Sequence, residues 1–236
     1  MPLVEPAIQA VAAEALDLVA DGARVGLGSG RAACAFIALL GARVRAGLQV
    51  SGVATSRAAA ADAREAGIPL IELEEGVTLD VTIDGADEVA PNLDLVKWWG
   101  GALVQERIVA AASRRQVIIV GHEKLVGALG ERGRIPVEII PLARWPVHAS
   151  LVSSGIVPTL RMEPGGRQPV VTDNGNFLLD CALPVPCPDG AAARALERRL
   201  LELPGVVDTG LFLGTAELVL VGQPDGGVLA LRREDR

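Results

Sequence analysis

Short apolar strands alternate with helices along the first half of the chain, and several of these strands run directly into glycine-rich or polar segments. The clearest case is the apolar strand 24–27, which overlaps the glycine-rich turn 26–30 and leads into a helical run at 32–44. Strands that alternate with helices are typical of a parallel sheet with helices on both faces. The sequence therefore predicts an α/β fold built on a parallel sheet.

The segments that follow these strands are expected to share one edge of the sheet. Ligands of open parallel sheets bind at the carboxyl ends of the strands. Four segments would lie there, namely 26–30, Thr55-Ser56, 84–87 and 121–124. We expect them to line one crevice.

A different pattern begins near residue 131. Short strands follow one another, and an Asn-Gly turn is expected to join strands 170–171 and 177–179 into a hairpin. A helix is expected at 190–201, before two further strands. This pattern predicts a small antiparallel α+β unit. No long linker separates it from the parallel part, so we expect the two parts to pack as one body.

Composition argues against several classes of partner. The 236 residues are 50% hydrophobic and 22% charged, which is enough to bury an ordinary core. The formal net charge is -7 and the basic residues are scattered, so we expect no nucleic-acid partner. The longest apolar run, 32–42, is too short to cross a bilayer, and no signal peptide is expected, so we expect no membrane partner.

The cysteines and histidines show no paired spacing. There are three cysteines and two histidines, and the sequence predicts neither a zinc site nor a disulfide framework. His122 is interpreted as a structural residue because no partner for it is visible in the sequence. The expected compartment is the cytoplasm, and no metal is expected.

Two carboxylates stand three residues apart at the end of an apolar strand. Asp84 and Asp87 enclose Gly85 and Ala86. Paired acids in a partly buried crevice can hold different protonation states, which suits proton transfer on a sugar. The alternative is a solvated Asp-Gly turn.

Glu106 is the second candidate for acid–base chemistry. Its neighbours three and four positions away in the expected helix 102–113 are all apolar. The spacing predicts a carboxylate on the inward face, whose pKa burial would raise toward that of a general base. The alternative is a buried structural glutamate paired with an arginine. Gly100-Gly101, just before the helix, would leave the N-terminus of the helix open to an anion.

The glycine-rich turn 26–30 can present backbone N–H groups to a phosphate. Arg31 stands where dinucleotide-binding loops have their third glycine, and no acid between Asp21 and Asp62 could bind a ribose, which disfavours NAD. No Gly-Lys-Ser/Thr follows, which argues against ATP or GTP. Arg31 is either a phosphate ligand or a solvated helix residue. Thr55 and Ser56 are expected to cap a helix rather than act as nucleophiles.

Lysine is almost absent from this chain. Of the 22 lysines and arginines, 20 are arginine, and only Lys97 and Lys124 remain. Arginine does not replace lysine where a compact ammonium must fit. The two lysines are therefore candidates for functional sites, with chance retention as the alternative.

Taken in order, these motifs resemble the type A family of ribose-5-phosphate isomerases. The stretches that carry the resemblance are 25–30, 54–56, 82–89, 100–103 with Glu106, 123–125, 136–138, 171–176 and 203–207. The resemblance implies a Rossmann-like parallel-sheet domain with an inserted, smaller ferredoxin-like α+β domain. We place the first domain at 1–130 and 213–236, and the second at 131–212.

The resemblance also implies an activity without cofactor or metal. The family interconverts ribose 5-phosphate and ribulose 5-phosphate through an enediolate, in the non-oxidative pentose phosphate pathway, as a homodimer or homotetramer. Glu106 would be the base that moves a proton between carbons 2 and 1. Asp84 and Asp87 would assist ring opening and hydroxyl proton transfer, and Lys97 would stabilise the developing oxyanion. The implied substrate-binding residues are Ser29, Gly30, Arg31, Ala32, Gly85, Ala86, Trp98, Trp99, Gly100 and Lys124.

Three departures from the family pattern stand out. The phosphate loop usually reads Thr-Gly-Ser-Thr but here is 29–32, Ser-Gly-Arg-Ala, and a lysine common in the first helix is missing. We hypothesise that Arg31 supplies the missing charge. Trp98 and Trp99 stand where the family usually has glycines, and a positive φ there would strain them by about 1–3 kcal/mol. Two further readings therefore stay open, a non-catalytic sugar-phosphate sensor and an isomerase of another phosphorylated sugar.

Overall fold

The protein is described by a computed structural model over residues 6–233. The chain forms two compact units. The first comprises the residues up to Ala86, Gln105–Lys124 and the residues from Gly214 onward, and the second comprises Asp87–Val104 and Leu125–Leu213. Residues 87–104 and 125–130, which the sequence-based limits place in the first domain, belong to the second of these units. The domain limits drawn from the sequence stay a prediction.

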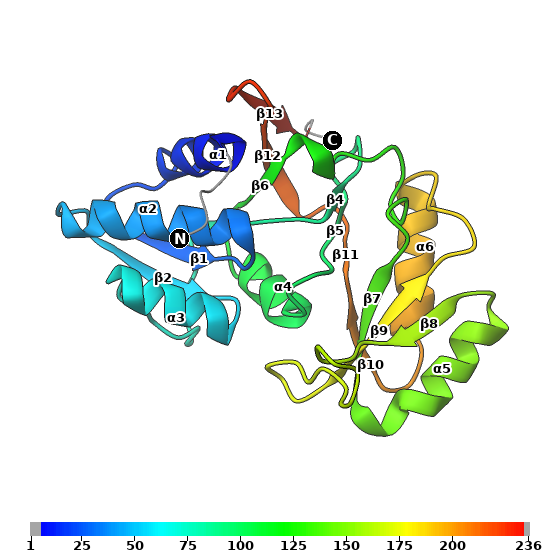
Figure 1. Ribbon diagram of the computed structural model, residues 1–236. Coiled ribbons are helices and arrows are strands. Elements are labelled where there is room, and N and C mark those ends of the chain that lie inside the picture. The colour runs from blue at the N-terminus through cyan, green and yellow to red at the C-terminus, as the bar shows by residue number, and fades with distance from the viewer. Residues whose placement is uncertain (1–5, 234–236) are drawn as a thin grey trace. The chain divides into compact units, whose positions relative to one another are not determined.

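The first unit is built on a six-stranded sheet with the order β13-β12-β6-β3-β1-β2 (Figure 1). Along the order β12-β6-β3-β1-β2, each strand is parallel to its neighbours. The edge strand β13 is antiparallel to β12. The α/β fold on a parallel sheet, expected from the alternation of strands and helices, is confirmed, and it agrees with the Rossmann-like domain that the resemblance implies. The strands are β1 Ala23–Leu27, β2 Val50–Ala54, β3 Val81–Asp84, β6 Gln116–Gly121, β12 Ala216–Gly222 and β13 Val228–Arg232.

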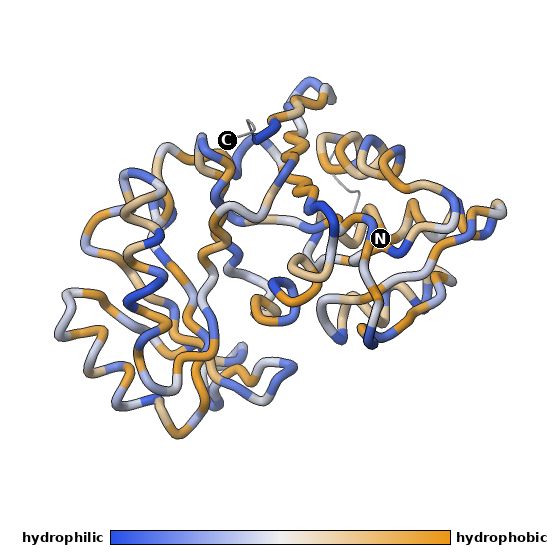
Figure 2. Tube along the Cα trace, turned by 180° about the vertical axis from the view of Figure 1, so that it is seen from behind, coloured by the Kyte–Doolittle hydropathy of each residue, from blue (hydrophilic) through white to orange (hydrophobic). Residues whose placement is uncertain are grey.

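Helices cover both faces of this sheet. On one face, α1 (Pro6–Leu16), α2 (Arg31–Arg45) and α3 (Arg57–Ala66) share a hydrophobic core with alternate residues of the strands, including Leu27 and Ile83. Figure 2 shows hydrophobic residues running along the strands. The opposite face carries α4, Leu103–Ala111. Because strand side chains alternate between faces, the residues between the core positions point toward α4.

Gly26 explains how closely α4 approaches the sheet. A Cβ at this position would lie 2.7 Å from Cγ1 of Val109, which is a residue of α4. Real Cβ atoms do not come this close to another carbon, so only glycine leaves room for the helix.

The second unit contains a four-stranded antiparallel sheet with the order β10-β7-β9-β8. Helices α5 (Arg144–Ser153) and α6 (Gly190–Leu201) pack on one face of it, against Val137, Leu179 and Cys181 among others. A small three-stranded sheet has the order β11-β5-β4. The strands are β4 Glu88–Val89, β5 Leu95–Val96, β7 Ile135–Ile139, β8 Val157–Leu160, β9 Phe177–Ala182, β10 Val206–Thr209 and β11 Leu211–Phe212.

The hairpin expected at the Asn-Gly turn is wrong in its first strand. Residues 170–171 lie outside the strands, and β9 pairs with β7 and β8 instead. The turn 172–176 is held by Glu138 of β7, which accepts hydrogen bonds from side chains of Thr172, Asn174 and Asn176. These polar side chains turn toward a buried carboxylate, and no ladder forms.

Between residues 6 and 233, none of the helices combines the length and the apolar character that crossing a membrane requires. The described residues also form two short 3-10 helices, η1 at His122–Lys124 and η2 at Pro141–Ala143.

Candidate active site

In the first unit, the expected segments lie at the carboxyl ends of four neighbouring strands. The strands β2, β1, β3 and β6 are adjacent and parallel, so the residues that follow them share one edge of the sheet. The glycine-rich turn follows β1, Thr55-Ser56 follows β2, Gly85 follows β3 and η1 follows β6. The convergence expected from the sequence is present in this unit.

Asp84 is the last residue of β3 and is fully buried. Its Oδ1 accepts hydrogen bonds from the backbone N–H of Gly85, at 2.7 Å, and of Ser29, at 3.1 Å. A Cβ on Gly28 would lie 2.5 Å from Cα of Asp84, so only glycine lets the turn after β1 approach this carboxylate. The turn and the carboxylate therefore form one structure, and Asp84 is not a solvated turn residue.

Three hydroxyl groups gather beside this turn. Oγ of Ser29 lies 2.9 Å from Oγ1 of Thr55 and 2.9 Å from Oγ of Ser56. Ser56 also caps α3, because its side chain accepts the N–H of Ala59, as expected. The sequence predicted that Thr55 and Ser56 lie at this strand edge, but not that their hydroxyl groups contact Ser29.

The N-terminus of α2 begins in the same turn. Gly30, with φ 90°, is its N-cap residue and provides no side-chain hydrogen bond, and Arg31 and Ala32 form the first turn of the helix. The unsatisfied N–H groups of a helix N-terminus attract anions. Arg31 is exposed and Ala32 is buried. Hydroxyl groups, helix N–H groups and a cationic side chain are thus present at one end of the unit.

Glu106 lies on α4 and is 5% exposed, so its expected burial is confirmed. The face of the sheet that α4 covers also carries Thr82 and Asp84, which alternate with the core residues of β3. The hydroxyl of Thr82 is hydrogen-bonded to that of Ser113, just beyond the end of α4, which ties the helix to this face. Two buried carboxylates, Asp84 and Glu106, thus belong to the same face of the first unit.

Lys124 ends η1, which follows β6, and it is partly exposed. His122 is exposed, with Nδ1 3.9 Å from a carboxylate oxygen of Glu123. The rare lysine therefore stands at the same strand edge as Ser29 and Asp84.

The second unit contains Asp87 and Lys97. Oδ2 of Asp87 accepts the backbone N–H groups of Trp98, at 2.6 Å, and of Trp99, at 2.9 Å. Lys97 is 5% exposed, and its backbone N–H donates to the carbonyl of Gly210. Its side-chain Nζ lies 5.7 Å from the ring centre of Phe212. The second rare lysine is therefore a buried ammonium beside an aromatic face, which is not typical of a solvated lysine.

The two tryptophans adopt ordinary backbone conformations. Leu93 is the one residue other than glycine with positive φ between residues 6 and 233. Positive φ in this segment occurs at Gly101, with φ 68°. Trp98 and Trp99 therefore carry none of the strain that a positive φ would cause, and the backbone accommodates tryptophan at both positions.

The expected site residues divide between the two units. Those in the first unit are Ser29, Gly30, Arg31, Ala32, Asp84, Gly85, Ala86, Glu106 and Lys124, and those in the second are Asp87, Lys97, Trp98, Trp99 and Gly100. Their assignment as catalytic and binding residues stays a prediction. Asp180 and Arg161, which contact the tryptophan pair, were missed because no local pattern marks them.

Comparison with known proteins gives a consistent result. The family described as ribose 5-phosphate isomerase A (phosphoriboisomerase A) matches residues 51–226. Ribose-5-phosphate isomerase A of Deinococcus radiodurans is 46% identical over 224 residues, which is 94% of each chain.

Solved structures agree with this match. Ribose 5-phosphate isomerase A from Methanocaldococcus jannaschii is 40% identical, with a TM-score of 0.89 over 96% of this chain and 98% of that one. A D-ribose-5-phosphate isomerase in complex with phospho-erythronic acid is 36% identical, with a TM-score of 0.90 over 96% and 98% of the two chains. This chain belongs to the ribose 5-phosphate isomerase A family.

Proposed function

We propose that this protein interconverts ribose 5-phosphate and ribulose 5-phosphate. The relatives that support this carry the isomerase name over nearly the whole chain, and one related structure holds a phosphorylated sugar acid. The single structural observation that carries the proposal is the pair of buried carboxylates, Asp84 and Glu106, on one face of the first unit.

Glu106 is proposed as the base of the carbon-to-carbon proton transfer. Its carboxylate removes the proton from C2 of the open-chain aldose, the electron pair of that bond forms the enediolate, and the same carboxyl group returns the proton to C1. A second proton moves from the oxygen on C2 to the oxygen on C1, so the reaction is balanced without any oxidant. Burial of the carboxylate suits it to accept a proton.

The remaining catalytic roles are proposed for Asp84, Asp87 and Lys97. The carboxylates of Asp84 and Asp87 assist ring opening and the proton transfer between the two oxygens. The ammonium of Lys97 stabilises the negative charge that develops on the enediolate oxygen. A buried cation is effective in this task, because little water screens it.

Phosphate binding is proposed for the strand edge of the first unit. The hydroxyl of Ser29, the first N–H groups of α2 at Arg31 and Ala32, and the ammonium of Lys124 are donors of the kind a phosphate dianion requires. The exposed position of Arg31 at the first turn of α2 supports the hypothesis that it supplies a charge to this site. The binding roles of Gly30, Gly85, Ala86 and Gly100, and of Trp98 and Trp99, are retained as part of the proposal.

The test is ribulose 5-phosphate formation by the purified, chelator-treated protein. Glu106→Gln removes the basic oxygen and keeps the size of the side chain, and we expect it to lower kcat by a factor of about 10³ or more, since a general base contributes about 10²–10⁴. Glu65→Gln, at an exposed position of α3, is the matched control and should leave the rate unchanged.

The outcome separates the readings that the sequence leaves open. Turnover that survives Glu106→Gln would contradict the assignment of the base. Binding of ribose 5-phosphate without turnover in the wild-type protein would indicate a sugar-phosphate sensor, and turnover of another phosphorylated sugar alone would indicate a different isomerase.

A cytoplasmic location and a homodimeric or homotetrameric assembly complete the proposal. All three cysteines carry free thiols, which is usual for proteins of reducing compartments. Light scattering of the purified protein measures the assembly directly.

A further inference from the structure

Asp180 is a buried carboxylate on the face of the four-stranded sheet that α5 and α6 leave uncovered. It belongs to β9 and alternates with Leu179 and Cys181, whose side chains pack toward the helices. Its side chain is 7% exposed and forms an ion pair with Arg161, which is 15% exposed. Arg161 donates Nε to Oδ2 at 3.0 Å and Nη2 to Oδ1, so the pair is bidentate.

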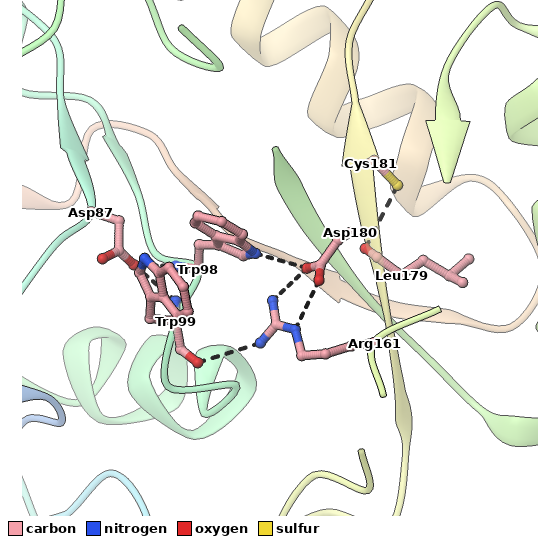
Figure 3. Close-up of polar contacts among 7 residues, drawn as sticks. All are labelled: Asp87, Trp98, Trp99, Arg161, Leu179, Asp180 and Cys181. Carbon is pink, nitrogen blue, oxygen red and sulfur yellow. Dashed lines mark hydrogen bonds and ion pairs between the residues drawn. The ribbon is translucent and has the colours of Figure 1, made fainter. Parts of the chain in front are cut away.

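This ion pair holds the tryptophan segment from one side. Oδ1 of Asp180 accepts the indole N–H of Trp98 at 2.8 Å, and Nη1 of Arg161 donates to the carbonyl of Trp99 at 3.4 Å (Figure 3). Asp180 lies 82 positions from Trp98 in the sequence, so this contact fixes two distant parts of the second unit to each other.

Asp87 holds the same two residues from the other side. Its Oδ2 accepts the backbone N–H groups of Trp98 and Trp99. With the bonds to the Trp98 indole and the Trp99 carbonyl, both the backbone and one ring of this segment are held by hydrogen bonds. The rings of Trp98 and Trp99 lie 4.5 Å apart at 42°, and the guanidinium of Arg134 lies 5.8 Å from the ring centre of Trp98. The backbone that orients Asp87 is therefore itself oriented through the indole of Trp98.

A buried ion pair is weak support for stability, because desolvation of both charges offsets their attraction. This pair, however, provides a directed acceptor for the Trp98 indole and a directed donor for the Trp99 carbonyl, which apolar side chains of the same volume could not provide. The ion pair therefore fixes the position of the segment that follows Lys97.

We propose that Asp180, together with Arg161, is a positioning residue of the isomerase. Through the indole of Trp98 and the backbone of residues 98–99, Asp180 sets the orientation of the Asp87 carboxylate and of the adjacent Lys97. The inference rests on the proposed function, in which Asp87 and Lys97 act on the sugar. It assigns a role to the two tryptophans and to a carboxylate whose hydrogen bonds go to Trp98 and Arg161.

Three variants test this chain of contacts. Trp98→Phe removes the indole N–H and keeps an aromatic ring. Asp180→Ala removes the acceptor, whereas Asp180→Asn keeps an oxygen that can accept the indole N–H and loses the charge. Trp145→Phe is the matched control, because Trp145 is an exposed residue of α5 that stacks on Arg144.

For the Asp180 variants, the expected kinetic result is a change in kcat with little change in KM. Trp98→Phe should lower kcat about tenfold, which is the effect of losing one hydrogen bond to a charged group, and Asp180→Ala should lower it by more. Asp180→Asn should recover part of that loss. The double variant Trp98→Phe/Asp180→Asn should be no slower than the slower single variant, since both changes act through the same bond. Trp145→Phe should match the wild-type rate.

Circular dichroism supplies a readout that does not depend on catalysis. Two indole rings 4.5 Å apart couple their transitions and give paired bands of opposite sign. In a Trp145→Phe background only the Trp98–Trp99 pair remains, because the chain has three tryptophans. Asp180→Ala should weaken these bands strongly, and Asp180→Asn should weaken them less.

Two results would overturn the proposal. If Asp180→Ala lowers Tm and weakens the bands but leaves kcat per folded molecule unchanged, the ion pair is a structural feature only. If the bands are unchanged, Asp180 does not hold the tryptophans. An inactive wild-type protein would refute the proposed function instead, and the bands would still report whether Asp180 orders the pair.

Discussion

Cys34 shows at the scale of one residue how neighbours set the reactivity of a side chain. It lies exposed on α2, and its Sγ donates to Oδ2 of Asp62 at 3.0 Å. Partial burial of the thiol, and then the hydrogen bond and the charge of Asp62, raise the pKa of Cys34 from 9.0 to about 12. Because the thiolate is the nucleophile, a raised pKa means that very little of the reactive form exists at neutral pH.

We therefore expect Cys34 to react slowly with iodoacetamide despite its exposure. The rate should rise about tenfold for each pH unit between pH 7 and 10, since the thiolate fraction rises by that factor below the pKa. Asp62→Asn removes the charge that opposes ionisation and should accelerate the reaction at pH 8. Mass spectrometry of the Cys34 peptide measures both rates. Alkylation of the wild-type thiol as fast as that of an unfolded peptide would contradict this prediction.

Single residues also show how far the sequence alone predicts the site. The apolar neighbours of Glu106 predicted its burial, and the scarcity of lysine singled out Lys97, which is buried beside Phe212. The bond between Trp98 and Asp180 had no such signal. Its partners are far apart in the chain, and neither lies in a pattern that implies the other.

At the scale of elements, the approach of α4 to β1 depends on one missing side chain. A Cβ on Gly26 would enter the space of Thr82 and lie 2.7 Å from Val109. Gly26→Ala should therefore lower the free energy of unfolding by about 1–3 kcal/mol, which is the usual cost of overpacking a core. Because α4 carries Glu106, we also expect kcat to fall.

A matched glycine separates this effect from the general cost of losing glycine. Gly127→Ala adds a Cβ whose nearest neighbour would be 3.5 Å away, an ordinary contact, at a position without positive φ. Urea unfolding of both variants measures the two costs. Equal stability of Gly26→Ala and wild type would show that α4 can move away from the strand freely.

Elements were predictable where their signal is local. Alternation of strands and helices predicted β1, α2, β2 and α3, and Ser56 marked the start of α3. The strand expected at 170–171 failed because a buried carboxylate on another strand, Glu138, binds the side chains of the following turn. Local turn chemistry predicts the turn, but a partner from elsewhere in the chain decides whether a ladder forms beside it.

At the scale of the whole molecule, the first unit is assembled from three separate stretches of chain. The last stretch supplies β12, which lies between β6 and β13 in the sheet. Residues 218–221 of β12 are buried, and its register with β6 runs from Ala216 to Gly222. The unit is therefore complete only when the end of the chain has returned to it, a topology that the sequence suggested through its resemblance and not through any local pattern.

This topology predicts that two truncations behave differently. A chain ending at residue 226 lacks β13, an edge strand whose side chains are largely exposed, and should still unfold cooperatively. Its Tm should fall by roughly 4–8 °C, which corresponds to about 2 kcal/mol at this size. A chain ending at residue 213 also lacks β12, so β6 and α1 lose buried contacts, and we expect the first unit to show no cooperative transition, whereas the second unit, which ends at Leu213, keeps all of its residues. Calorimetry of the two chains measures this difference, and a cooperative transition of the first unit in the shorter chain would show that β12 is not needed to form the sheet.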